Sequence, residues 1–374
     1  MAGIYIHIPF CRHKCSYCNF YSTASANYRN VIAEVISAEL ELRKSFLTEE
    51  INSIYVGGGT PSLLPVGDIH KMLESVYRTY DIAPDVEITF EANPDDLTFS
   101  YLSELKKIGI NRISIGIQSF HKEDLLYLER VHKAERIPEI MDAIVRAGYK
   151  NVNADLIYGI PGQTMLMVEQ NINRLTDYPV NHISAYALTV EPKTRLNIQI
   201  AKQKKGKPDD KVLASHFLKT SEILSRKGFE HYEISNFALP GNYSNHNMSY
   251  WFQKPYMGLG PSAHSFNGIS RSWNVSSIYQ YINAIRNNQL PEEKEILSEA
   301  QKFNEHVMLR LRTQWGIDMQ EVAQKFGPEW HNDLRSAFKQ IQQPEKIKST
   351  NNKIKLTRQG FLYADGLASE LFRD

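Results

Sequence analysis

Strand-like and helix-like segments alternate along the first half of this 374-residue chain. The strand-like segments are short apolar runs that end in glycine, proline or a polar residue, and the segments between them carry apolar residues at helical spacing. Six such units indicate parallel strands joined by helical crossovers. Their spacing of about 25–45 residues fits a barrel and an open doubly wound sheet equally well. We expect strands at residues 3–9, 53–56, 86–91, 112–117, 152–157 and 182–187.

All three cysteines of the chain follow the first expected strand, as Cys11, Cys15 and Cys18 in a C-x3-C-x2-C spacing. Neither a helix nor a strand gathers that spacing on one face, so the thiols can converge only from a loop. An iron–sulfur cluster takes one cysteine per iron, and a four-iron cluster here would keep one iron open. A disulfide framework would leave one cysteine over. A closed zinc site would need His7 or His13 as its fourth ligand.

The cysteine spacing resembles the signature of radical S-adenosylmethionine (SAM) proteins, in which the amino and carboxylate groups of SAM bind the open iron. The wider phrase Y-I-H-I-P-F-C-R-H-K-C-S-Y-C, at residues 5–18, is similar to the oxygen-independent coproporphyrinogen III oxidase family. The resemblance implies a [4Fe–4S] cluster on the three cysteines and SAM as the second cofactor. It also implies a partial (β/α)6 barrel, which decides between the two α/β folds.

Polar or glycine residues recur where the expected strands end, and functional groups gather at that end of strand–helix barrels. Glycines let the backbone approach SAM, carboxylates and an amide can hydrogen-bond its ammonium and ribose, and an arginine suits its carboxylate. In the resembling family, the aromatic residue between the last two cysteines and the tyrosine of strand one also contact SAM. The expected SAM-binding residues are Tyr5, Tyr17, Gly58, Gly59, Thr60, Glu91, Gln118, Arg130 and Asp155.

The composition after the barrel divides the rest of the chain into two further expected regions. In the last part of the chain, three helices plus a strand pair resemble a winged helix, which often binds DNA, but no basic recognition face stands out. The expected regions are the barrel at 1–228, an irregular aromatic-rich extension at 229–295 and a C-terminal helical, winged-helix-like domain at 296–374. In the last region we expect helices at 298–312, 318–326 and 329–342, a strand at 353–357 and a final helix from 358.

The extension contains the stretch His246-Asn-Met-Ser-Tyr250-Trp251. It looks like the H-N-x-x-Y-W motif of the heme chaperone (HemW-type) branch of the family. The structural alternative is a histidine in an aromatic loop, satisfied by local hydrogen bonds. Together with the rest of the resemblance, the motif predicts that His246 binds heme iron between stacking aromatic side chains.

Two features separate this chain from the oxidases it resembles. Those enzymes have C-x3-C-x2-C-x-C, whereas the last position here is Phe20, and a long substrate-binding segment precedes their cluster, whereas ten residues precede Cys11. The resemblance therefore favours a chaperone that binds heme and delivers it to acceptor proteins. One alternative is the oxidase, which converts coproporphyrinogen III to protoporphyrinogen IX by decarboxylating two propionates. The other is a winged-helix regulator that senses SAM or iron.

The overall charge limits the expected partners. Lysine plus arginine (43) nearly balance aspartate plus glutamate (42), so we expect no nucleic-acid partner and at most a peripheral membrane contact. The N-terminus has no basic segment followed by an apolar run, and no apolar run reaches about 18 residues. Clustered thiols without an export signal predict a reducing, cytoplasmic location. Besides heme or a porphyrin, the expected partners are heme-acceptor proteins and an electron donor.

Overall fold

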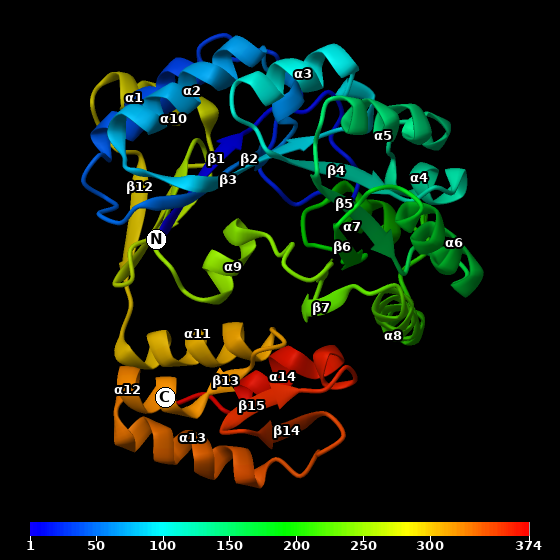
Figure 1. The fold of residues 1–374 in the computed structure, drawn as a ribbon, viewed down its shortest axis with the longest axis vertical. Helices are drawn as coiled ribbons and strands as arrows, with labels where there is room; N and C mark the ends of the chain where they lie inside the picture. The colour runs from blue at the N-terminus through cyan, green and yellow to red at the C-terminus, as the bar shows by residue number, and fades with distance from the viewer. Residues whose placement is uncertain (374) are drawn as a thin grey trace.

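The computed structural model describes residues 1–373 and is built around a curved sheet (Figure 1). Its first six strands run parallel and pair in sequence order, so that Ile4 of β1 pairs with Ile54 of β2 and Phe90 of β3 pairs with Ile113 of β4. Each strand overlaps the segment expected from the sequence. They are β1 (Ala2–Ile8), β2 (Ile51–Gly58), β3 (Ile82–Ala92), β4 (Arg112–Gln118), β5 (Asn151–Tyr158) and β6 (His182–Ala187).

Helices between the strands cover the outer face of this sheet (Figure 1). In α2, Ile69, Met72, Leu73 and Val76 are buried, which is the spacing of one helix face. The crossover helices are α1 (Ile32–Leu42), α2 (Val66–Thr79), α3 (Phe99–Lys107), α4 (Lys122–Leu128), α5 (Ile137–Arg146) and α6 (Met165–Thr176). Single 3-10 turns lie at η1 (Pro61–Leu63), η2 (Pro94–Asp96) and η3 (Ala134–Arg136).

The two faces of the parallel strands differ in polarity. Side chains alternate between the faces of a strand, and in β1 the buried Ile4, Ile6 and Ile8 alternate with Tyr5 and His7. The same alternation places polar side chains on the inner face of the following strands, where most of them are buried. These inner residues are Ser53, Tyr55, Glu87, Thr89, Glu91, Arg112, Ser114, Asn153, Asp155, His182 and Ser184. The concave interior is therefore polar and the layer beneath the helices is apolar.

The expectation of an irregular extension is wrong, because this region adds strands to both edges of the sheet. At one edge β9 pairs in parallel with β1, where Tyr256 lies opposite Gly3. At the other edge β8 pairs antiparallel with β6, where Phe237 lies opposite Ile183. Within residues 1–373 the sheet has twelve strands, and its edges, β12 and β7, do not pair with each other. The added elements are β7 (Glu230–Glu233), β8 (Asn236–Ala238), α9 (Asn245–Trp251), β9 (Tyr256–Leu259), β10 (His264–Phe266), β11 (Ser270–Asn274), α10 (Ile278–Arg286) and β12 (Glu292–Ile296).

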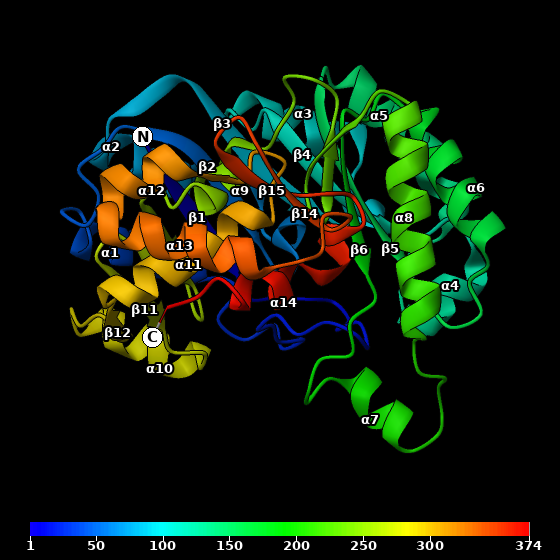
Figure 2. The same ribbon diagram turned by 90° about the horizontal axis from the view of Figure 1, so that it is seen from below.

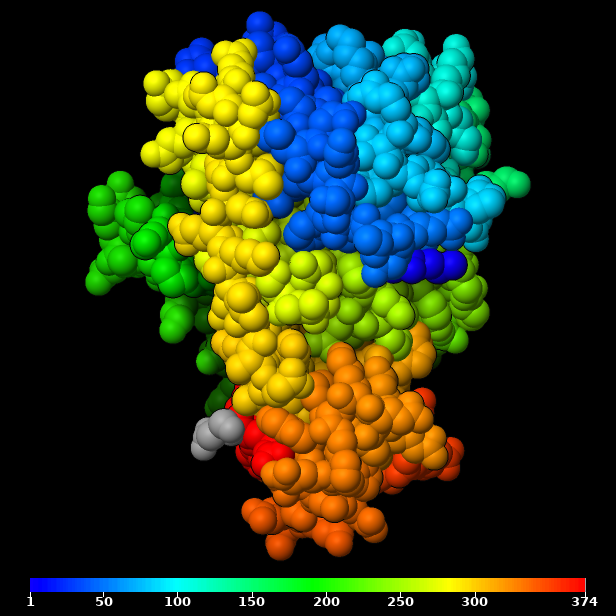
Figure 3. All heavy atoms as spheres, turned by 90° about the vertical axis from the view of Figure 1, so that its left-hand side faces the viewer, coloured from blue at the N-terminus to red at the C-terminus, as the bar shows by residue number. Residues whose placement is uncertain are grey.

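The C-terminal elements form a separate lobe below the barrel, next to α9 (Figures 1 and 3). The three expected helices are found within two residues of their predicted bounds, and the expected strand pairs with two strands that the sequence did not predict. The lobe contains α11 (Glu299–Leu311), β13 (Ile317–Asp318), α12 (Met319–Phe326), α13 (Pro328–Gln340), β14 (Ile347–Thr350), β15 (Lys353–Leu356), η4 (Gly360–Tyr363) and α14 (Ala364–Ser369).

Two further helices follow β6. The short α7 (Arg195–Ala201) projects away from the body of the molecule, and α8 (Asp210–Arg226) returns along the barrel (Figure 2). In the part of the chain that the structure describes, no helix combines the length and the apolar character needed to cross a bilayer.

Candidate cluster and cofactor site

The cysteine loop follows β1 and is tied to its surroundings by backbone hydrogen bonds. The Cys11 amide donates to the Thr23 carbonyl (2.9 Å), and the Thr23 amide donates to the Pro9 carbonyl (2.8 Å). Further along the loop, the Ser16 amide donates to the Leu128 carbonyl at the end of α4 (3.3 Å). The three cysteines of this anchored loop line a cavity of about 620 Å³ at the carboxyl ends of the strands.

The three thiols lie close enough to influence one another. Burial raises the pKa of the Cys18 thiol, and Cys11 and Cys15 raise it further. Among residues 1–373, no three His, Cys, Asp or Glu side chains converge on a site for a single metal ion. The cysteines of an iron–sulfur cluster each bind a different iron, and soft thiolates are its preferred ligands. The donor set of this loop therefore fits a cluster.

The glycines after β2 pack directly against the end of β1. Gly58 has a φ of +108°, and a Cβ atom there would lie 2.5 Å from the ring of His7. A Cβ atom on Gly59 would lie 2.4 Å from the Phe10 carbonyl oxygen. A side chain at either position would collide with the strand that carries the cysteine loop. The sequence analysis expected these glycines because they let the backbone approach SAM. The structure shows a second reason for glycine here, which is the close packing of this turn against the end of β1.

Glu91 ends β3 beside the cavity and is held by two hydrogen bonds. Its Oε1 accepts from the Tyr55 hydroxyl (2.6 Å) and its Oε2 accepts from the Gly58 amide (3.0 Å). Burial raises the pKa of Glu91 to about 7, and the nearby Asp155 adds to this effect. Burial also raises the pKa of Asp155, which accepts from the Asn153 amide (2.8 Å). A cation bound next to these two buried carboxyl groups would stabilise their ionised forms and lower their pKa values.

Arg130 brings a positive charge to the same cavity. Its Nη2 donates to the Gly116 carbonyl (2.7 Å) and to the Asn93 side chain (3.2 Å), while its Nη1 lies 3.7 Å from the Cys15 sulfur. His132, two residues on, places its Nδ1 3.4 Å from the Arg130 Nε. The guanidinium is thus fixed from several sides and suits an anionic group bound next to the cysteines.

Gln118 adopts an unusual backbone conformation at the end of β4. Its φ is +67°, in the left-handed region that residues other than glycine seldom adopt, and the pairing of β4 with β5 shifts register between Gly116 and Gln118. The Gln118 side chain lines the cavity, and its Oε1 is buried without a hydrogen-bond partner among the described residues. Strained backbone and an unpaired buried acceptor are typical of a ligand-binding residue.

The cavity brings together most of the residues predicted to bind the cluster and SAM. Tyr5 is not among the lining residues, because it lies deeper in the interior with its hydroxyl 3.0 Å from His7 Nδ1. Their roles in binding stay predictions. The predicted residues that line the cavity are Cys11, Cys15, Tyr17, Cys18, Gly58, Gly59, Thr60, Glu91, Gln118, Arg130 and Asp155.

Further polar residues that the sequence analysis did not name line the cavity, among them Asn93, Ser114 and Tyr186. Asn93 follows β3 and donates to the Thr60 hydroxyl (3.2 Å), Ser114 lies in β4, and Tyr186 lies at the end of β6. Tyr186 and Asn93 obey the strand-end rule that identified Glu91 and could have been found by it. Ser114 could not, because it lies in the middle of its strand.

His246 lies on α9, away from this cavity. It is 2% exposed, its Nδ1 lies 3.0 Å from the Ser53 hydroxyl, and its Nε2 lies 2.9 Å from the Tyr250 hydroxyl. Its ring stacks on Tyr55 with centroids 5.0 Å apart. Burial and then Arg112 lower the pKa of His246 to about 3, so the ring is neutral. In this conformation neither ring nitrogen is available to a heme iron.

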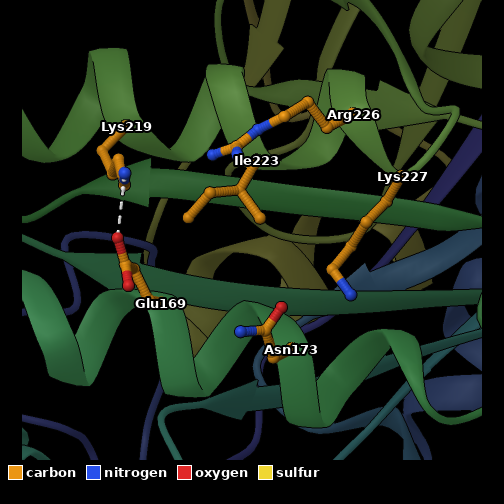
Figure 4. Close-up of a pocket in the computed structure, with 6 residues that line it drawn as sticks. All are labelled: Glu169, Asn173, Lys219, Ile223, Arg226 and Lys227. Atoms are coloured by element: carbon orange, nitrogen blue, oxygen red, sulfur yellow. Dashed lines mark ion pairs between the residues drawn. The ribbon is translucent and has the colours of Figure 1, made fainter.

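A second hollow lies between α6 and α8 on the outer surface (Figure 4). It has a volume of about 410 Å³, and Lys219 is paired there with Glu169 (2.9 Å), while Arg226 is paired with Glu222 (2.8 Å). In partly exposed ion pairs of this kind the two charges neutralise each other, and such pairs contribute little to ligand binding. We assign no ligand to this groove.

Parallel strands in an arc, a three-cysteine loop after the first strand and a polar cavity at the strand ends define a radical SAM protein. Residues 5–175 match the sequence model of the Radical SAM superfamily, and residues 297–363 match that of the HemN C-terminal domain. The heme chaperone HemW of Bacillus subtilis (strain 168) is 32% identical, with the alignment covering 100% of this chain and 98% of that protein. The chain belongs to the HemW family of radical SAM proteins.

A second relative supports this family assignment, and one solved structure supports the fold. The heme chaperone HemW of Lactococcus lactis subsp. lactis (strain IL1403) is 30% identical over 99% of this chain and 97% of its own length. The structure of coproporphyrinogen III oxidase (HemN) from Escherichia coli superimposes with a TM-score of 0.85 at 20% identity, covering 99% of this chain and 90% of that one. The predicted radical SAM fold is confirmed.

We expect Arg130→Met to weaken SAM binding, because the variant removes the buried cation beside Cys15. A hydrogen bond to a charged group contributes about 1.5–3 kcal/mol, so the affinity should fall by roughly one to two orders of magnitude. Equilibrium dialysis of SAM against cluster-loaded protein measures this change. Arg136→Met is the matched control, since Arg136 is a partly exposed arginine outside the cavity lining that pairs with Asp95 (3.3 Å). Equal affinities in both variants would contradict the assignment of Arg130.

Proposed function

We propose that the chain is a heme chaperone that carries a [4Fe–4S] cluster and SAM and passes heme to acceptor proteins. The observation that carries this proposal is the pair of curated relatives, named heme chaperones, whose alignments span almost the whole of both chains. The proposal includes a cytoplasmic location and an electron donor for the cluster as partner.

In this proposal the cavity at the strand ends holds both cofactors. Cys11, Cys15 and Cys18 bind the cluster, and Arg130 binds the SAM carboxylate. Glu91, Asp155 and Gln118 accept hydrogen bonds from its ammonium group and ribose. The cluster with SAM supplies radical chemistry in proteins of this class. The chain's own residues orient the two cofactors and shield them from water.

The second candidate function is that of coproporphyrinogen III oxidase, because the fold is similar to the Escherichia coli HemN structure. At 20% identity, that similarity supports the fold alone. The family's oxidases have a further cysteine where this chain has Phe20, which is 68% exposed at the cavity. A phenyl ring offers apolar surface to a flat ligand and has no thiol chemistry, so this position favours the chaperone.

The test is to offer the reconstituted protein both ligands under anaerobic conditions. We expect the wild type, with cluster, SAM and reductant, to bind ferric heme with a Soret shift and to yield no protoporphyrinogen from coproporphyrinogen III. Absorption spectroscopy follows the heme and product fluorescence follows the turnover. Formation of protoporphyrinogen without heme binding would reverse the order of the two candidates.

A further inference from the structure

A heme needs two things from a protein, an electron-pair donor for the iron and flat apolar surface for the ring. His246 does not offer the first in this conformation, because Ser53 and Tyr250 occupy both of its nitrogens. Releasing it would require α9 to leave its position against β1 and β2. A site that already presents both features to solvent would bind heme without that cost.

The mouth of the cysteine-lined cavity presents both features. His13 lies in the cysteine loop between Cys11 and Cys15, is exposed, and lines the cavity. Buried histidines elsewhere in the chain, such as His182 and His306, are enclosed by the protein. An exposed imidazole at the edge of an open cavity can reach an iron atom from solvent.

Phe20 supplies the apolar surface in the same loop. Its side chain is 68% exposed and lines the cavity, and the Lys14 ammonium donates to its carbonyl oxygen (3.0 Å), which closes the loop. Tyr186, 43% exposed at the end of β6, and Leu188 line the same cavity. A phenyl ring left in solvent at the mouth of a cavity indicates a surface that a ligand covers.

Charge and exposure agree with the same ligand. Lys14 lines the cavity mouth and is partly exposed, so a cation is available there for a propionate group. Arg130 and Asp155 are less exposed than His13 and Phe20, which leaves the mouth of the cavity for a second ligand.

We propose that heme binds at the mouth of the cluster cavity, with His13 as its iron ligand and Phe20 as its stacking surface. This inference rests on the proposed function, since it concerns where the heme of a heme chaperone is held. It places the iron of the heme next to the cluster loop and leaves His246 as a structural residue.

The test is a titration with ferric heme, carried out on protein with and without the cluster, so that cluster loss in a variant does not hide the outcome. We expect His13→Ala to lose the Soret shift of the wild type and to bind heme at least about tenfold more weakly. His13→Tyr should keep heme but with a changed spectrum, because phenolate is also a heme ligand. Phe20→Ser should weaken binding and keep the wild-type spectrum.

His264→Ala is the matched control, because His264 is also exposed and lies beside an aromatic ring, Trp273 (6.0 Å between centroids), away from the cavity. It should behave as the wild type does. If wild-type protein binds no heme, the proposed function fails. If wild-type protein binds heme and both His13 variants keep its spectrum and affinity, the site proposed here is wrong and the chaperone function stands. Loss of the Soret shift in His246→Ala with His13→Ala unaffected would assign the iron ligand to α9.

Discussion

Replacing Cys15 by alanine should leave the anaerobically reconstituted protein without its iron–sulfur cluster. The chain has three cysteines, all in one loop, so the variant has no other thiol that could take over the lost ligand position. The variant keeps two thiolates, which can hold only two irons of the cluster, whereas the wild type offers three. The broad absorption near 400 nm and the protein-bound iron and sulfide should fall close to background, and SAM binding should fall with them.

Ser22→Ala is the control for this experiment. Ser22 lies in the same loop, and its hydroxyl is buried without a hydrogen-bond partner among the described residues, so its removal costs little. The control should take up iron and sulfide as the wild type does. A Cys15→Ala protein that keeps a full cluster would show that the ligands come from elsewhere and would overturn the site.

The six parallel strands could be predicted because their signals are local. Each is an apolar run that ends in glycine, proline or a polar residue, and the helices between them repeat at helical spacing. The C-terminal helices could be predicted for the same reason. The start of α11 (Glu299–Leu311), for example, is marked by a local signal, the capping box of Ser298 and Gln301. The winged-helix-like arrangement was predicted from these three helices and a strand pair.

The strands β7–β11 could not be predicted because their pairing is not local. They are three to five residues long, and β9 pairs with β1, about 250 residues away along the chain. Short segments rich in glycine and asparagine carry too little alternation to be recognised alone. What makes them strands is the free edge that the barrel offers, and that edge exists only in the folded protein.

The site divides in the same way. The strand-end rule predicted cavity residues such as Gly58, Glu91 and Asp155, because the carboxyl ends of parallel strands meet at one edge whatever the details of packing. The strand-end rule could not predict that His246 is buried, since its ring lies against Tyr5 of β1 and Ser53 of β2, which are distant in sequence. Its spacing to Tyr250 did hold a signal, because residues four apart share a helix face, and their side chains are hydrogen-bonded in the structure.

The structure predicts that His246→Ala destabilises the protein strongly. The substitution removes a buried ring that stacks on Tyr55 and leaves the Ser53 and Tyr250 hydroxyls without their partner. A cavity combined with unpaired buried hydroxyls costs about 3–5 kcal/mol in free energy of unfolding. Urea unfolding of the cluster-free protein, followed by circular dichroism, measures this loss.

Tyr250→Phe separates the hydrogen bond from the packing, since it keeps the ring and removes only the hydroxyl. It should cost about 1–3 kcal/mol, because the Nε2 of His246 then lacks a partner. The exposed His264→Ala should change stability by less than about 0.5 kcal/mol. If His246→Ala proves as stable as His264→Ala, α9 is not held by this histidine. The ring would then be free to leave the interior and bind iron, which is the role that the H-N-x-x-Y-W motif predicts for it.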